Sequence, residues 1–113
     1  GSIAHAQAHL MIIAIVTFQF DASRSREQMK LVFQSSAPKY LNLPGLARKN
    51  YWLAEDGRSG GGIYFWTTRK AAEDCYSGEW RERVTRLYGG APDIRYIDSP
   101  VLVDNAAGRI ESD

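Results

Sequence analysis

The order of hydrophobic and polar positions predicts four β-strands along this chain. Residues 11–20 (MIIAIVTFQF) are rich in β-branched and aromatic residues and contain no turn former, which is typical of a strand. A second strand is expected over 46–54 and a third over 62–67. The fourth is expected over 94–103, where Pro100 indicates an edge position or a break because proline cannot donate a ladder hydrogen bond.

Two helical stretches separate these strands. The first carries apolar residues at the three- and four-residue spacing of one helical face: Met29, Val32, Phe33 and Ala37. Pro38 is expected to end it. The second begins near Arg69 and carries a similar stripe: Ala72, Tyr76, Trp80, Val84 and Leu87. Gly78 is expected to interrupt this second stretch, since glycine costs about 1 kcal/mol inside a helix.

This element order predicts the fold class. Strand, helix, strand, strand, helix, strand gives an α+β, ferredoxin-like β-α-β-β-α-β domain, with a four-stranded antiparallel sheet and two helices on one face. The first strand is apolar on both faces, with Ala14 and Val16 on one and Ile13 and Ile15 on the other. Because two helices cover one face only, we expect a homodimer in which a second copy covers the open face. The alternative is a small, half-solvated patch.

Composition narrows the expected partners. The 113 residues include 14 basic and 13 acidic side chains, scattered to a formal net charge of +1. This balance argues against nucleic acid or an anionic membrane as a partner, and no window reaches the length of a membrane span. Cys75 is the only cysteine, so it is expected to be an inert buried thiol, and one unpaired thiol fits a cytoplasmic protein.

The two ends of the chain differ from its centre. Residues 1–10 (GSIAHAQAHL) are expected to be a tag remnant or a disordered extension, with Met11 as the natural start. The ferredoxin-like domain is expected over 11–104, followed by a frayed tail over 105–113. Both histidines, His5 and His9, fall in the first of these segments.

The remaining residue types limit the chemistry that the domain is expected to perform. Without histidine it offers no Ser-His-Asp triad, histidine-ligated iron or haem, and a single cysteine excludes four-cysteine metal sites. Gly60-Gly61-Gly62 leads into a strand, whereas a phosphate-binding loop precedes a helix, so these glycines are expected to belong to a hairpin whose connection spans 55–61. No metal and no other cofactor is expected.

A pocket of ordinary side chains is therefore the expected site. It would lie between the open sheet face and its covering partner, with these residues as its lining: Thr17, Gln19, Lys49, Tyr51, Tyr64 and Trp66. Asn50 and Trp52 are candidates if the other face of the second strand points inward. Apolar walls with a few polar groups are typical of small-molecule sites. The competing interpretation is that the aromatic residues are core and that the lysine is a solvated amine.

Two linked motifs in the second and third strands resemble a known family. Residues 44–51 read PGLxxKxY and residues 61–66 read GGIYxW. This is similar to the YdhR-like monooxygenase family, whose pattern runs PGLxxKxW and then GGIYxF at the same spacing. The helix at 69–76 (RKAAEDCY) is also similar, and the likeness spans most of 11–104. Tyr51 and Trp66 depart from the family's commoner residues.

The resemblance implies a dimeric α+β barrel and an oxygenase that needs no cofactor. The implied substrate is a small aromatic, phenolic or polyketide-like compound whose own carbanion supplies electrons to oxygen. In that chemistry Lys49 would stabilise the anion and Tyr64 would donate a hydrogen bond or relay a proton, while Tyr51 and Trp66 would stack on the ring. Two alternatives use the same pocket: a non-catalytic dimer that binds a small hydrophobic ligand, and a non-oxidative cyclase or isomerase.

Overall fold

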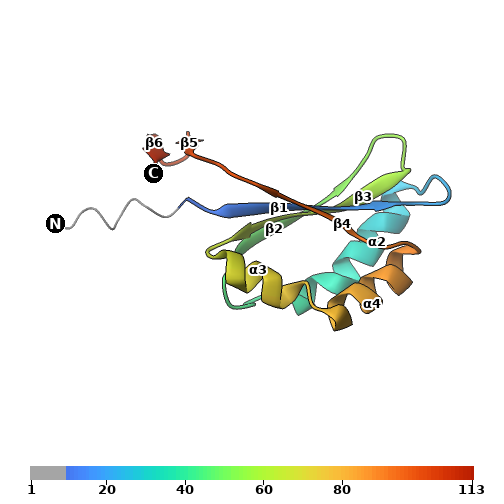
Figure 1. Ribbon diagram of the computed structural model, residues 1–113. Coiled ribbons are helices and arrows are strands. Elements are labelled where there is room, and N and C mark those ends of the chain that lie inside the picture. Colours follow the sequence, from blue (N-terminus) through green and yellow to red (C-terminus); the bar gives the residue numbers. More distant parts are fainter. Residues whose placement is uncertain (1–9) are drawn as a thin grey trace.

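The predicted fold class is confirmed by a computed structural model, which describes residues 10–113 (Figure 1). The expectation for the first ten residues therefore lies almost wholly outside the described part. Four antiparallel strands form one sheet in the order β2-β3-β1-β4. Their bounds are β1 Ile12–Gln19, β2 Leu46–Leu53, β3 Ser59–Trp66 and β4 Asp93–Ile97.

The helices cover one face of this sheet, as Figure 1 shows. They are α2 Arg26–Ser36 with a 3₁₀ turn at Ala37–Lys39, α3 Arg69–Cys75 and α4 Gly78–Tyr88. Helix α2 begins at a capping box, in which Ser25 accepts from the Gln28 backbone N–H and the Gln28 side chain accepts from the Ser25 N–H.

The interruption expected at Gly78 is confirmed, and the second helical stretch is two helices. Ser77 is the N-cap of α4, because its side chain accepts a hydrogen bond from the Trp80 backbone N–H. The break changes which residues face the sheet. Tyr88 is 5% exposed, whereas Leu87, which the unbroken stripe placed on the buried side, is 40% exposed.

Strand alternation separates the two faces of the sheet. Ala14, Val16 and Phe18 are buried beneath the helices, while Ile13 and Ile15 lie on the open face and are half-buried. Directly opposed residues share a face, so the strand register extends this assignment across the sheet. Tyr64 pairs with Ala14 on one side and with Lys49 on the other, which places all three beneath the helices.

Strand β3 begins at Ser59, earlier than the expected 62, so the assignment of Gly60 and Gly61 to the hairpin connection is wrong. These glycines are strand residues where neighbouring groups come close. A Cβ at Gly60 would lie 2.8 Å from the Trp52 carbonyl oxygen, and one at Gly61 would overlap the carbonyl oxygen of Val16. Glycine is therefore required by space within the sheet.

The C-terminal part also differs from the prediction. The fourth strand breaks before Pro100, as the proline indicated, and β5 Val101–Asp104 pairs with β6 Arg109–Ser112. The frayed tail expected from Asn105 is wrong, because most of it forms the turn and second strand of this hairpin. Figure 1 shows the β5–β6 hairpin extending beyond the end of the main sheet. Within residues 10–113, no helix has the length and apolar character needed to cross a membrane.

Candidate functional site

The structure divides the six predicted site residues between the two faces of the sheet. Lys49, Tyr51, Tyr64 and Trp66 lie on the face that the helices cover, whereas Thr17 and Gln19 lie on the open face. The expectation of one cleft between the open face and a partner is therefore wrong for the first four. Their side chains are enclosed by the helices of their own chain.

Lys49 lies inside a box of tyrosine rings, here called the Lys49 chamber. Its Nζ is 3.5 Å from the ring centroid of Tyr40, 3.9 Å from that of Tyr51 and 4.5 Å from that of Tyr64. An ammonium group at these distances is attracted by the negative faces of the rings. The chamber therefore holds one amine among three aromatic faces.

Burial governs the charge of this amine. Desolvation lowers the pKa of Lys49 to about 7, with the nearby Arg83 guanidinium acting in the same direction and Cys75 opposing it. Among residues 10–113, no carboxylate forms an ion pair with Lys49. Close to neutral pH the group thus exchanges between amine and ammonium, and its ammonium form has no protein counter-anion there.

Hydrogen bonds fix the rings around the amine. The Tyr51 hydroxyl and Ser36 Oγ are 2.6 Å apart, and Trp80 Nε1 donates to the Tyr40 hydroxyl at 2.9 Å. Deeper in the core, Trp66 Nε1 donates to the Tyr76 hydroxyl at 3.1 Å. Each bond joins a ring to a helix or to a neighbouring aromatic side chain, so the orientations of the rings around Lys49 are fixed.

Tyr64 forms the sheet side of the chamber. Burial raises the pKa of Tyr64 well above its ordinary value, with Tyr40 and Tyr76 adding to the effect. Burial likewise raises the pKa of Tyr51 to about 12. Both hydroxyls therefore stay protonated at neutral pH and remain able to donate hydrogen bonds.

Gly62 makes room for the two central side chains. A Cβ at this position would lie 2.8 Å from Tyr64 Cε1 and 2.9 Å from Lys49 Cε. Any larger residue would therefore push against both. The second glycine of the GGIYxW motif thus has a spatial role in the chamber.

Two recesses reach this region along the edge of β2. The smaller, of about 350 Å³, is lined by Tyr40, Asn42, Leu46, Lys49 and Tyr51 among others. The larger, of about 660 Å³, lies between α2 and β2 and does not include Lys49. Tyr51 lines both, so its ring and its bond to Ser36 stand between the larger groove and the lysine.

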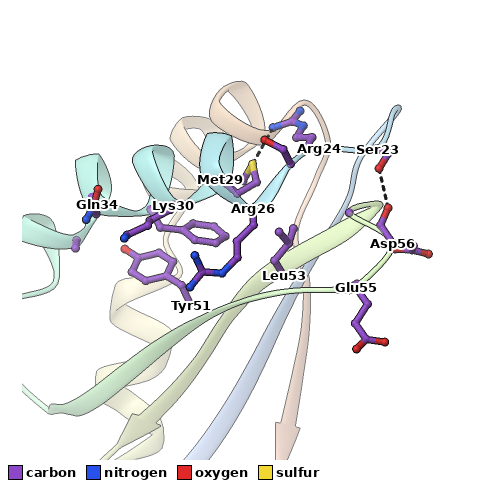
Figure 2. Close-up of a pocket in the computed structure, with 15 residues that line it drawn as sticks. Ser23, Arg24, Arg26, Met29, Lys30, Gln34, Tyr51, Leu53, Glu55 and Asp56 are labelled. Carbon is purple, nitrogen blue, oxygen red and sulfur yellow. Dashed lines mark hydrogen bonds between the residues drawn. The ribbon is translucent and has the colours of Figure 1, made fainter.

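The larger groove combines an apolar floor with basic side chains. Its floor includes Met29 and the stacked pair Phe33 and Tyr51, whose ring centroids are 4.7 Å apart. Figure 2 shows Arg26 extending from α2 across the groove, while Glu55 points away from it. This groove meets the chamber at Tyr51, which lines the groove and lies against Lys49 Nζ.

The residues of the open face form no comparable enclosure. Thr17 is half-buried and Gln19 exposed at the end of β1, and neither makes a side-chain hydrogen bond within residues 10–113. Asn50 and Trp52, the conditional candidates, also lie on this face, since Asn50 pairs with Ile63 and Trp52 with Gly61. Trp52 Nε1 is enclosed there, and it has no hydrogen-bond partner in the described part of the chain.

The side chains that the structure describes form neither a metal-binding cluster nor a reactive thiol. Over residues 10–113, no group of three or more His, Cys, Asp or Glu side chains is placed to hold a metal ion. Cys75 is half-buried, and burial raises the pKa of its thiol to about 11. The thiol form therefore predominates at neutral pH, which makes Cys75 a poor nucleophile.

Sequence reasoning missed three members of this site: Tyr40, Ser36 and Gly62. Tyr40 follows the 3₁₀ turn, where no periodic pattern points to a buried ring. Ser36 is a polar residue at the end of a helical stripe, and only its bond to Tyr51 reveals its role. Gly62 was detectable, because it belongs to the GGIYxW motif, but its use became clear only from the space around it.

Several solved structures share this architecture. A monooxygenase from the gene ActVA-Orf6 of Streptomyces coelicolor, solved in complex with Nanaomycin D, matches with a TM-score of 0.66 and 19% identity over 87% of this chain and 95% of that one. SnoaB, a cofactor-independent oxygenase from Streptomyces nogalater, matches with a TM-score of 0.59 and 16% identity over 80% and 93%. The fold is shared.

A third solved structure also has this fold. A conserved protein from Methanosarcina mazei matches with a TM-score of 0.60 and 14% identity over 84% of this chain and 98% of that one. No protein-family model and no curated protein matches the chain. The similarity at these identities establishes the fold, and the resemblance to the YdhR-like family stays a prediction.

Proposed function

We propose that this chain is a cofactor-independent monooxygenase of the YdhR-like type, acting on a small aromatic or polyketide-like compound in the Lys49 chamber. The observation that carries this proposal is the unpaired amine of Lys49 among three tyrosine rings. Its pKa of about 7 suits a group that takes a proton at neutral pH and then stands as a cation beside the anion it has made. The fold shared with known oxygenases supports the same assignment.

The proposed reaction converts an activated methylene group into a carbonyl group. Lys49 in its amine form removes a proton from the substrate carbon, and the resulting ammonium stabilises the carbanion. The carbanion transfers electrons to O₂, and a carbon–oxygen bond forms to give a peroxide. Loss of the second carbon-bound hydrogen and cleavage of the O–O bond release water, so CH₂ and O₂ become C=O and H₂O.

The tyrosines have supporting roles in this mechanism. Tyr64, which burial keeps protonated, is assigned as the hydrogen-bond donor to the oxygen that carries the substrate's delocalised charge. Tyr51 is assigned to stacking, since its ring lies between the larger groove and the amine. Trp66 is fully buried and bonded to Tyr76, so we assign it to the wall behind Tyr64.

We further infer that the protein works as a homodimer in which the open sheet face meets a second copy. That face presents an aliphatic and aromatic surface on its central strands: Ile13, Ile15, Ile63 and Phe65. The β5–β6 hairpin adds Val101, Val103 and Ile110, which are 58%, 61% and 73% exposed. An isolated two-stranded hairpin is marginally stable, so a second copy that contacts it would account for both surfaces.

Oxygen consumption tests the proposed function. Purified protein is incubated with anthrone- and quinol-type compounds, and uptake is compared with the spontaneous rate of each compound alone. We expect uptake with at least one of them and conversion of its CH₂ group to C=O. Equal turnover without oxygen would instead identify a cyclase or isomerase, and binding without turnover would identify a ligand-binding dimer.

A further inference from the structure

The chain contains four lysines, and one of them differs sharply from the rest. Lys30, Lys39 and Lys70 are exposed, whereas Lys49 is half-buried and faces the tyrosine rings. Burial disfavours the ammonium form of an amine, and among these four lysines it is Lys49 that burial affects in this way. Lys49 is thus the lysine best placed to present a free lone pair.

We propose that Lys49 is a covalent site for carbonyl compounds, condensing with a small aromatic aldehyde or ketone to form a Schiff base. This activity goes beyond oxygenation and does not depend on it. A nucleophilic lysine requires an unprotonated amine, space for the carbonyl carbon and walls that hold the rest of the molecule. The Lys49 chamber offers each of these.

The space comes from the smaller recess. Its volume is about 350 Å³, and Lys49 is part of its lining together with Tyr40, Leu46 and Tyr51. The two tyrosine rings that hold the amine would also pack against the ring of an aromatic aldehyde after condensation. An aryl carbonyl compound therefore suits this recess better than a charged or strongly hydrated one.

The other nucleophilic groups around Lys49 stay protonated, so they do not compete with its amine for a carbonyl compound. The tyrosine hydroxyls of β2 and β3 stay protonated, since burial raises the pKa of Tyr51 and of Tyr64. Helix α3 contributes Cys75, whose thiol pKa burial raises to about 11, and α4 contributes the cation of Arg83. Arg83 disfavours a second positive charge nearby and so favours the free amine.

The proposed step needs no oxidant or reductant. The Nζ lone pair attacks the carbonyl carbon, and one amine hydrogen passes to the oxygen to give a carbinolamine. The carbon–oxygen bond then breaks, and the oxygen leaves as water with the second amine hydrogen. The product is a C=N bond at Lys49, which hydrolysis reverses.

Reductive trapping tests the proposal on the wild-type protein. The protein is treated at pH 7 with benzaldehyde and sodium cyanoborohydride, which transfers hydride to the imine carbon and leaves a stable benzylamine. Peptide mapping by mass spectrometry then gives the initial rate at each lysine, so that Lys30, Lys39 and Lys70 act as internal controls. We expect Lys49 to react at least about tenfold faster than these three.

The dependence of the labelling rate on pH and on folding distinguishes reaction in the Lys49 chamber from non-specific reaction at exposed lysines. The preference for Lys49 should be largest near pH 7 and should shrink toward pH 9, since burial already frees much of this amine at pH 7. In urea the preference for Lys49 should disappear. A folded protein in which Lys49 reacts no faster than the exposed lysines, or a preference that survives unfolding, would overturn the proposal. Because no oxygen is consumed, either result leaves the proposed monooxygenase to be judged separately.

Discussion

The two faces of the central sheet are built from the same four strands and differ in almost every property. The helix-covered face holds a half-buried amine and several tyrosine hydroxyls, two of which accept hydrogen bonds from tryptophan side chains. The open face holds half-buried isoleucines with few polar groups near its centre, and one enclosed indole N–H without a partner in the described chain. One face resembles a site for chemistry and the other a surface for association.

This difference teaches how a small domain can accommodate both roles. Successive residues of a strand point to opposite faces, so Lys49 and Asn50 are neighbours in the chain and lie on opposite sides of the sheet. Substitutions one residue apart should therefore affect either the chamber or the association surface. The first prediction below uses such a pair.

The largest expected effect is a loss of stability when a large side chain on the helix-covered face is truncated. Trp66 is fully buried and its indole N–H is bonded to Tyr76, so Trp66→Ala should lower the free energy of unfolding by about 3–5 kcal/mol. Phe65→Ala, one residue away on the open face, should cost clearly less in the monomeric protein. Urea unfolding at a concentration where the protein is monomeric measures both. Equal losses would contradict the division between the faces.

The next effect is on association. Ile15→Arg places a charge in the middle of the open face of each copy, and by symmetry both copies carry it. We expect the dimer to dissociate at least about 100-fold more readily, since an unpaired buried charge costs several kcal/mol. Light scattering after gel filtration reports the mass. Leu31→Arg is the matched control, because Leu31 is 68% exposed on α2 and should leave the mass unchanged.

A smaller effect is expected from filling the chamber. Gly62→Ala introduces a Cβ that must displace Lys49 Cε and Tyr64 Cε1, so oxygen uptake should fall by about tenfold while the fold is retained. In Gly78→Ala the new Cβ meets no atom within 4 Å, and this variant should keep full activity. If both variants keep the wild-type rate, the central position of Lys49 in the reaction is refuted.

A further predicted effect is a pH dependence of stability. The pKa of Lys49 is lowered to about 7 by folding, so between pH 7 and its ordinary value of 10.5 the unfolded chain binds more protons. Stability contributed by this group therefore rises with pH across that window. Melting temperatures of the wild type and Lys49→Met, measured from pH 7 to pH 9, should show a difference that moves in favour of the wild type as the pH rises. A constant difference would mean that burial does not shift this amine.

Much of the fold could be predicted from the sequence because strand and helix periodicities are local. The alternation of Ile13, Ala14, Ile15 and Val16 assigned the faces of β1 correctly. The break at Gly78 was also foreseen, since glycine weakens a helix wherever it lies. The C-terminal hairpin was missed because its strands are short and its second strand follows a polar turn.

The site was harder to predict because the faces of different strands must be matched. Alternation groups Thr17 with Gln19 and Lys49 with Tyr51, but it does not say whether the two pairs share a face. That depends on strand register, which sets Tyr64 against both Ala14 and Lys49. The position of the Tyr40 ring beside Lys49 depends on the path of the chain after α2, which local sequence patterns do not indicate.

Oxygen uptake by a pair of variants from opposite faces tests the central claim most directly. With a substrate that the wild type oxidises, Lys49→Met should lower the rate by about 10²–10⁴-fold, the usual loss when a general base is removed. Thr17→Val, which changes the open face, should keep the wild-type rate, and both variants should retain the wild-type mass. A large loss in Thr17→Val, or an unchanged rate in Lys49→Met, would contradict the assignment of the chemistry to the helix-covered face.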